Sequence, residues 1–408
     1  MICKPGRLGL CVLVLGLMLS GCGDDDSGPT PVTGVEISPG SSTLEIAGTQ
    51  EFTATVSGGD SKSVDWYVND IPGGSSEVGT IIAASPATYT APEEVPDPAT
   101  VVVKAVSRQD GSMMDSCLVT IQFTKIHVNA SSGNDATGTG SVANPLKSIT
   151  AGLQIAQAGM TVHAAAGVYD AANGEVFPFE LKESVSLVGE SRENTTIRGH
   201  SEVVSYYLAI EMQGDGCQLR NFTLEEGPVV DEGWNLALHI DGVENAVVES
   251  IRVSERAGYG VFRVYYSNNT RIEDCILEVD DGEMDSHGIE FNANDGNNIV
   301  RNCTIRGFGL GIALNNFANP LIEGCTIEEN RTGVNLCCAS LVDHNPNPDL
   351  GGGARGSAGG NLIRNNTNYG IRNGSTNTIY AKFNTWGNDP PVEGEDFYNE
   401  ATGTVIWE

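Results

Sequence analysis

Three stretches of this chain superimpose residue by residue: IEDCIL at 272–277, VRNCTI at 300–305 and IEGCTI at 322–327. Looser copies, LRNFTL and VESIRV, begin at residues 219 and 248, so successive copies start 22 to 29 residues apart. This period is typical of architectures in which short strands stack coil upon coil and bury a continuous core. The repeat therefore predicts a stack of β-coils.

Each copy has the same internal pattern. Its first, fourth and sixth residues are apolar or Cys, and its third is Ser, Asp, Asn or Gly. The pattern predicts two short strands joined at a bend whose third residue is left-handed, a conformation that Asn, Asp and Gly tolerate best. The fourth residues should form a buried ladder: Ile251, Cys275, Cys303 and Cys325. A Cys303–Cys325 disulfide is the alternative that distance alone allows. The second residues should point outward as a weak salt-bridge ladder: Glu249, Glu273, Arg301, Glu323 and Arg364.

Two basic residues and an apolar run over 8–19 open the chain, a pattern typical of a signal peptide and too short for a membrane span. The run ends in Leu19-Ser20-Gly21-Cys22, which resembles the bacterial lipobox, in which the cysteine is acylated and becomes the mature N-terminus. The resemblance implies a signal peptide over 1–21 and a lipid anchor on Cys22, followed by a disordered tether over 22–31. We expect the protein in the bacterial cell envelope, anchored to the outer membrane on its periplasmic or outer face.

The formal net charge of −31 bears on the partners. Nucleic acids and anionic lipids both require a basic surface, so neither is expected as a ligand. Cations and neutral glycans remain compatible with such an acidic chain.

Residues 32–123 contain short alternating segments separated by Gly, Pro, Ser and Asp, as in a small β-sandwich. The strand at 64–68, the Tyr89-Thr90-Ala91-Pro92 stretch and the closing strand at 117–121 resemble bacterial Ig-like domains. Trp66 is then expected in the core rather than in a ligand site.

From residue 125 the pattern changes. The stretches 126–129, 167–169 and 185–190 resemble the opening of a bacterial domain of unknown function that commonly heads right-handed parallel β-helices of the pectate-lyase-like, carbohydrate-binding and sugar-hydrolase type. The resemblance implies an all-β chain in which 125–408 form such a helix after the Ig-like sandwich. Periodicity predicts a short amphipathic helix over 145–157, which would cap the open end of the coils.

A second strand precedes each copy by about ten residues, with apolar inward pairs such as Leu238 and Ile240. Its outward positions form two predicted columns. The first contains His239, Arg263, Glu290, Ala313 and Asn335, and the second contains Asp241, Tyr265, Asn292, Asn315 and Cys337. We take Arg263, His239 and Glu290 as candidate catalytic residues and Asp241, Tyr265, Asn292 and Asn315 as candidate binding residues. The alternative is a solvated sheet face with an Asn ladder.

The connections to this face include a long acidic loop. It crowds Asp280, Asp281, Glu283 and Asp285 into six residues, a density that suits Ca²⁺ without the spacing of an EF-hand. The alternative is a solvated loop. A Pro- and Gly-rich insertion over 343–360 is expected to be mobile.

Two functions follow from these patterns. The first is an envelope lipoprotein whose β-helix binds carbohydrate or another surface component without turnover. The alternative is a polysaccharide lyase or related carbohydrate-active enzyme, because pectate-lyase-like enzymes use an Arg or Lys base with calcium. Hydrolysis by Asp241 and Glu290 is disfavoured, since two coils separate their backbones by more than ~9.6 Å.

Overall fold

The computed structural model describes residues 28–199, 201–203, 206–225, 234–254, 260–279, 286–293, 296–337 and 345–408. The predicted signal peptide and Cys22 lie outside these residues. No helix within the described ranges is long and apolar enough to span a membrane.

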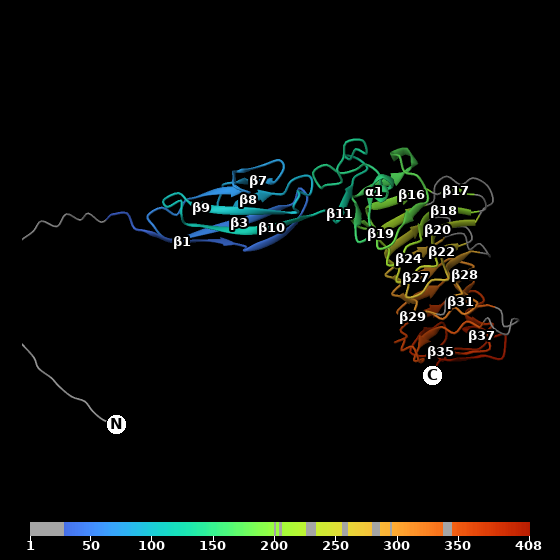
Figure 1. Ribbon diagram of the computed structural model, residues 1–408. Helices are drawn as coiled ribbons and strands as arrows, with labels where there is room; N and C mark the ends of the chain where they lie inside the picture. Colours follow the sequence, from blue (N-terminus) through green and yellow to red (C-terminus); the bar gives the residue numbers. More distant parts are fainter. Residues whose placement is uncertain are drawn as a thin grey trace, which may run out of the picture.

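The N-terminal part is a sandwich of two five-stranded sheets with strand orders β1-β3-β8-β7-β6 and β2-β10-β9-β4-β5 (Figure 1). Trp66 is buried between them with Phe52 and Tyr89, in the core position expected from the sequence. The strands are β1 (Val32–Ser38), β2 (Ser41–Glu45), β3 (Thr49–Gly58), β4 (Val64–Val68), β5 (Ile71–Pro72), β6 (Gly74–Ser75), β7 (Gly79–Ile82), β8 (Ala87–Thr90), β9 (Thr100–Ser107) and β10 (Met114–Gln122).

The sandwich joins the second part through a short connection. Phe123 packs against the cores of both parts. The carboxylate of Glu45 accepts hydrogen bonds from the backbone and hydroxyl of Thr124, and Glu93 accepts one from the Ser141 hydroxyl at 2.6 Å. Polar contacts therefore tie the sandwich to the first coil.

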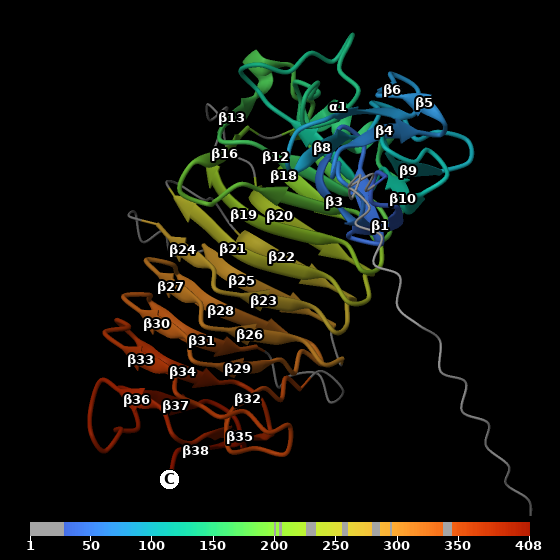
Figure 2. The same ribbon diagram turned by 90° about the vertical axis from the view of Figure 1, so that its left-hand side faces the viewer.

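The second part is a right-handed parallel β-helix whose coils stack from α1 to the C-terminus (Figure 2). One sheet of 18 described strands contains β11 (Lys125–Val128), β12 (Thr161–Ala164), β13 (Gly167–Asp170), β15 (Ser186–Gly189), β16 (Thr195–Arg198), β19 (Gln218–Glu225), β21 (Val247–Ser254), β23 (Arg271–Glu273), β24 (Ile276–Glu278), β26 (Ile299–Arg301), β27 (Thr304–Arg306), β29 (Leu321–Glu323), β30 (Thr326–Glu328), β32 (Asp349–Gly351), β33 (Leu362–Arg364), β35 (Thr378–Ala381), β36 (Thr385–Trp386) and β38 (Thr404–Ile406). A sheet of ten described strands contains β14 (Phe179–Leu181), β17 (Ser201–Val203), β18 (Tyr206–Met212), β20 (Trp234–Asp241), β22 (Gly260–Tyr265), β25 (His287–Asn292), β28 (Leu310–Asn315), β31 (Thr332–Leu336), β34 (Tyr369–Asn373) and β37 (Phe397–Asn399). The fold predicted from the repeat is confirmed.

The repeated unit bends as predicted. Its third residue has a positive φ, between 54° and 64°, in all five copies: Asn221, Ser250, Asp274, Asn302 and Gly324. Cys275, Cys303 and Cys325 are buried free thiols stacked on successive coils. Each thiol lies within hydrogen-bonding distance of the carbonyl two residues earlier, at 3.2–3.4 Å. The buried ladder is confirmed, and the alternative of a Cys303–Cys325 disulfide is wrong.

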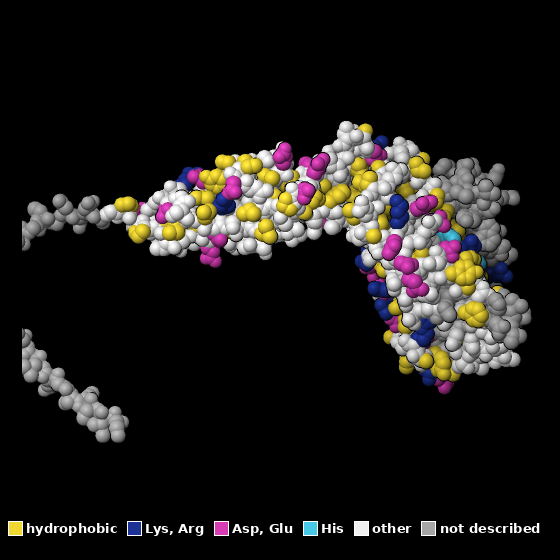
Figure 3. All heavy atoms as spheres, in the orientation of Figure 1, with side chains coloured by type: hydrophobic (Ala, Val, Ile, Leu, Met, Phe, Trp, Pro, Cys, Tyr) yellow, Lys and Arg dark blue, Asp and Glu magenta, His cyan; other side chains and the backbone are white. Residues whose placement is uncertain are grey.

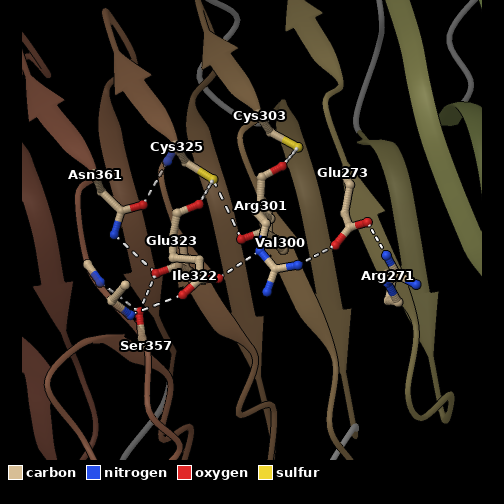
Figure 4. Close-up of polar contacts among 12 residues, drawn as sticks. Arg271, Glu273, Val300, Arg301, Cys303, Ile322, Glu323, Cys325, Ser357 and Asn361 are labelled. Atoms are coloured by element: carbon tan, nitrogen blue, oxygen red, sulfur yellow. Dashed lines mark hydrogen bonds and ion pairs between the residues drawn. The ribbon is translucent and has the colours of Figure 1, made fainter.

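Outside the bend, the salt-bridge ladder is present with one change. Figure 4 shows Arg301 between Glu273 and Glu323, at 2.8 and 2.7 Å. Arg364, however, pairs with Glu328 at 2.9 Å in the neighbouring column, because β32 takes the place of the first strand in that coil.

The insertion before Arg364 is an ordered loop over its described residues. The buried carboxylate of Asp349 accepts hydrogen bonds from the backbone nitrogens of Gly351, Gly353, Arg355 and Ser357. One side chain thus satisfies four backbone donors of the turn over 349–357, and the mobility of the insertion stays a prediction from the sequence.

The N-terminal coil carries the predicted cap. The helix α1 (Ile149–Ile155) packs against β11, β12 and β14 through Ile149, Gly152 and Leu153. It starts later than 145 because Ser148 is its N-cap, and it ends earlier than 157, with Ile155 exposed. A short 3₁₀ helix, η1 (Ala171–Asn173), follows β13.

Candidate functional site

The candidate site lies on the outer face of the ten-stranded sheet, on β20, β22, β25 and β28. The strand pairs align His239 with Arg263 and Arg263 with Glu290. They also align Asp241 with Tyr265, and Tyr265 with Asn292 and then Asn315. The inward neighbours, such as Leu238 and Ile240, are fully buried. The predicted columns therefore exist in the expected register, and Glu211 and Arg372 extend the first column at its two ends.

A column of glycines sets the backbone of this face. Gly288, Gly311, Gly333 and Gly370 occupy the second position of successive strands. A Cβ on any of them would lie 2.6 Å from a carbonyl oxygen of the next coil. Side chains are therefore excluded from this column. The recurrent pattern of glycine, aliphatic, variable, apolar in GIEF, GIAL and GVNL, with asparagine in the last place of GIRN, is the sequence signal that could have predicted it.

Glu290 is the centre of the polar cluster. Its carboxylate pairs with the Arg263 Nε at 3.2 Å and lies 3.7 Å from the His287 Nδ1. It also accepts hydrogen bonds from the Tyr265 hydroxyl at 3.0 Å and the Asn315 Nδ2 at 3.1 Å. Four side chains from β22, β25 and β28 thus converge on one carboxylate. His287 was not among the residues predicted from the sequence, because it lies at the end of a loop of variable length.

These contacts determine the charge of Glu290. Burial alone would raise its pKa, but the nearby His287 imidazole, the charge of Arg263 and the hydrogen bond from Tyr265 outweigh burial and hold the pKa at about 2. Glu290 is therefore ionised at neutral pH. An ionised carboxylate with four partners cannot donate a proton and is a poor proton acceptor.

Tyr265 links the two predicted columns. The Arg263 guanidinium lies over its ring at 5.1 Å, and the His239 ring meets it edge-on at 5.9 Å. Burial raises the pKa of the Tyr265 hydroxyl. These contacts fix the Tyr265 ring on the sheet face.

His239 lies at the other end of the cluster. Burial lowers its pKa despite the nearby Asp241 and Glu211, so the imidazole is neutral at pH 7. Neither ring nitrogen has a hydrogen-bond partner among the described residues, and the Glu211 carboxylate lies 3.7 Å from Nδ1. His239 therefore contributes a neutral, largely buried ring to the face.

The Arg263 guanidinium is engaged by the Glu290 carboxylate through its Nε at 3.2 Å. A guanidinium carries hydrogen-bond donors and no acceptor, and the role of Arg263 as a catalytic base stays a prediction from the sequence. Hydrogen-bonding side chains also line the face, among them the exposed Asp241 and the partly buried Asn292. Two asparagines of neighbouring coils bond to one another, since Asn316 donates to Asn292, while Asn315 donates to Glu290.

The predicted calcium ligands Asp280, Asp281, Glu283 and Asp285 lie outside the described residues. Among the residues that are described, no group of three or more His, Cys, Asp or Glu side chains could hold a metal ion. Calcium binding stays a prediction from the sequence.

The coiled parallel sheets place the chain in the class of right-handed parallel β-helix proteins. Pectate lyase Pel9A shares this fold with a TM-score of 0.50 and 11% identity, over 69% of this chain and 76% of that chain. Rhamnogalacturonan lyase (TM-score 0.43, 14% identity, 63% and 74% covered) and pectin methylesterase PemA from Erwinia chrysanthemi (0.41, 12%, 68% and 93%) are also similar. At these identities the likeness establishes the fold alone.

Residues 131–393 match the family described as protein of unknown function, DUF1565, and the chain belongs to that family. The resemblance noted at the opening of the β-helix is thereby confirmed and extends through most of the coils. A comparison with curated proteins found no match.

Proposed function

We propose that the β-helix binds carbohydrate on the face of β20, β22, β25 and β28 without turning it over. The observation that carries the proposal is the state of Glu290. Its four partners leave the central carboxylate ionised and engaged, and the carboxylate in turn engages Arg263. The cluster thus holds the face rigid, while Asp241, Asn292 and aromatic rings remain at its surface.

The fold supports carbohydrate as the ligand class. Parallel β-helices with this architecture include pectate lyase Pel9A, whose name describes an enzyme acting on a polysaccharide. The stacked coils form a long, rigid face that can follow an extended chain over several residues. This support is an analogy of fold, and binding experiments identify the ligand itself.

Glycan binding without turnover is testable on the purified protein. We expect it to retain at least one polysaccharide in affinity electrophoresis and to release no unsaturated product from polygalacturonate or alginate, with calcium or with chelator, as followed by absorbance. Calcium-dependent product that disappears in Arg263→Ala would instead establish the lyase alternative. The matched control is Arg364→Ala, because Arg364 forms an ion pair outside the face.

We further propose that lipid on Cys22 holds the protein at the bacterial envelope, as the lipobox-like sequence implies. Acyl chains on one cysteine provide stable membrane attachment, and the acidic tether keeps the folded part off the surface. Cys22→Ser should abolish incorporation of labelled palmitate and move the protein from the membrane fraction to the soluble fraction. Cys3→Ser, within the predicted signal peptide, should leave both readouts unchanged. Retention of label in Cys22→Ser would contradict the anchor.

A further inference from the structure

Tyr266 has a conformation that its side chain does not favour. It follows β22, has a positive φ of 49° and exposes 66% of its surface. The corresponding residues of the neighbouring coils are Gly242, Ala293 and Asn316, with φ between 53° and 65°. A bulky aromatic residue is a clear outlier in this region, and an exposed ring contributes little packing to offset the strain. Stability therefore does not explain a tyrosine at this turn.

A second exposed aromatic residue lies in the equivalent turn two coils further along. Phe317 directly follows Asn316 and exposes 46% of its surface. Strands β22 and β28 flank β25, so the two turns are about 9.6 Å apart along the axis at the usual strand spacing. A disaccharide unit of an extended glycan spans a similar length. Alternate sugar rings of one glycan chain can therefore contact the two aromatic side chains.

The polar cluster holds the first of these rings in place. Tyr265 meets Tyr266 edge-to-face, with ring centroids 6.3 Å apart and an interplanar angle of 85°. Tyr265 is itself fixed by Glu290 and Arg263. The Glu290 network thus supports the ring of Tyr266 before any ligand arrives, which lowers the entropy lost on binding.

The surrounding charge selects the kind of sugar. Glu211 and Asp241 lie on the face, and Glu244 accepts hydrogen bonds from the turn that follows Tyr266. The Arg263 guanidinium lies on the same side and is paired with Glu290. Figure 3 shows acidic and basic side chains, a histidine and exposed hydrophobic side chains close together on one flank of the β-helix. Such a surface repels uronate, sulfate and phosphate groups, whereas its carboxylates and amides can bind sugar hydroxyls.

We propose that Tyr266 and Phe317 form an aromatic platform that stacks against alternate rings of one uncharged glycan chain lying along the β-helix axis. The platform deepens the proposed function and rests on it. It also assigns the ligand to the neutral polysaccharides rather than to polyuronates.

The test uses the full chain on an array of neutral, uronic-acid and sulfated glycans, followed by calorimetry on the tightest neutral ligand. Tyr266→Ala should weaken the Kd by about tenfold or more, and Phe317→Ala should weaken it in the same direction. Tyr266→Phe keeps the ring and should retain affinity. The Tm of Tyr266→Ala should not fall below that of the wild type, since the substitution matches Ala293 in the next coil.

The matched control is Phe383→Ala. Phe383 is also left-handed and 70% exposed, but it follows β35 in the other sheet. Its substitution should leave the Kd unchanged. If the wild type and Tyr266→Ala bind a neutral glycan with equal Kd values, the platform is overturned and the proposed function stands. Binding of anionic chains alone overturns the assignment to neutral glycans. No binding to any glycan on the array overturns both the platform and the proposed function.

Discussion

Replacing Glu290 with alanine should lower the free energy of unfolding of the β-helix by about 3 kcal/mol. The side chain of Glu290 is 7% exposed and that of Arg263 is 13% exposed, so this ion pair is largely removed from water. Without the carboxylate, the Arg263 guanidinium loses its ion pair with Glu290 in the interior of the cluster. Tyr265 and Asn315 lose an acceptor at the same time.

Urea unfolding followed by circular dichroism measures this loss. The control is Glu328→Ala, which removes the partner of a more exposed ion pair, with 15% exposure at Glu328 and 47% at Arg364. Screening by water limits that pair to roughly 0–1 kcal/mol. Equal losses in the two variants would contradict a central role for Glu290.

The pH dependence of stability provides a second test of the role of Glu290. The pKa of Glu290 is held at about 2 in the folded protein, below the ordinary 4.5. A depressed carboxyl pKa contributes stability that is complete above the unfolded pKa and is lost as the pH falls through the folded pKa. The stability difference between wild type and Glu290→Gln should therefore be constant above about pH 5 and shrink towards pH 2. A difference that stays constant to pH 2 would show that Glu290 does not carry this linkage.

The register of the candidate site could be predicted because the strand period is two. The cysteine bend fixes the position of each coil, and the alternation along the preceding strand then assigns its inward residues and the outward columns of His239 and Asp241. The predicted column failed at Arg364, where the insertion contributes β32 as an extra strand. A repeat alignment cannot detect a strand that lacks the repeat pattern.

The chemistry of the site depended on features that the columns do not contain. His287 reaches Glu290 from the start of its own strand, and the side chains of Tyr265 and Asn315 reach it from adjacent coils. Column positions assign a direction to each side chain and leave its rotamer open. The ion pair between Arg263 and Glu290 could not be predicted for this reason, since it depends on side-chain conformations in neighbouring coils.

Replacing Gly311 with alanine should lower the free energy of unfolding of the β-helix by about 2–3 kcal/mol, because the added methyl group overpacks a closed interface. Its Cβ would lie 2.6 Å from the Gly333 carbonyl oxygen and 3.0 Å from the Asn330 Nδ2. Neither neighbour can move freely. Gly333 is part of β31, and the Asn330 Nδ2 donates to the Ile305 carbonyl in the core. The coils must therefore separate locally, which lengthens the hydrogen bonds between β28 and β31.

The control for Gly311→Ala is Gly242→Asn in the same sheet. Gly242 has open space around its Cβ position and a φ of 65°, and Asn316 occupies the equivalent turn with a φ of 53°. Asparagine tolerates this conformation, so the free energy of unfolding should change by less than about 0.5 kcal/mol. Urea unfolding of both variants compares a closed glycine position with an open one. If Gly311→Ala is as stable as Gly242→Asn, coil spacing is adjustable at this column. In that case the glycines at 288, 311, 333 and 370 are not required for the tight stacking that holds the polar columns in register.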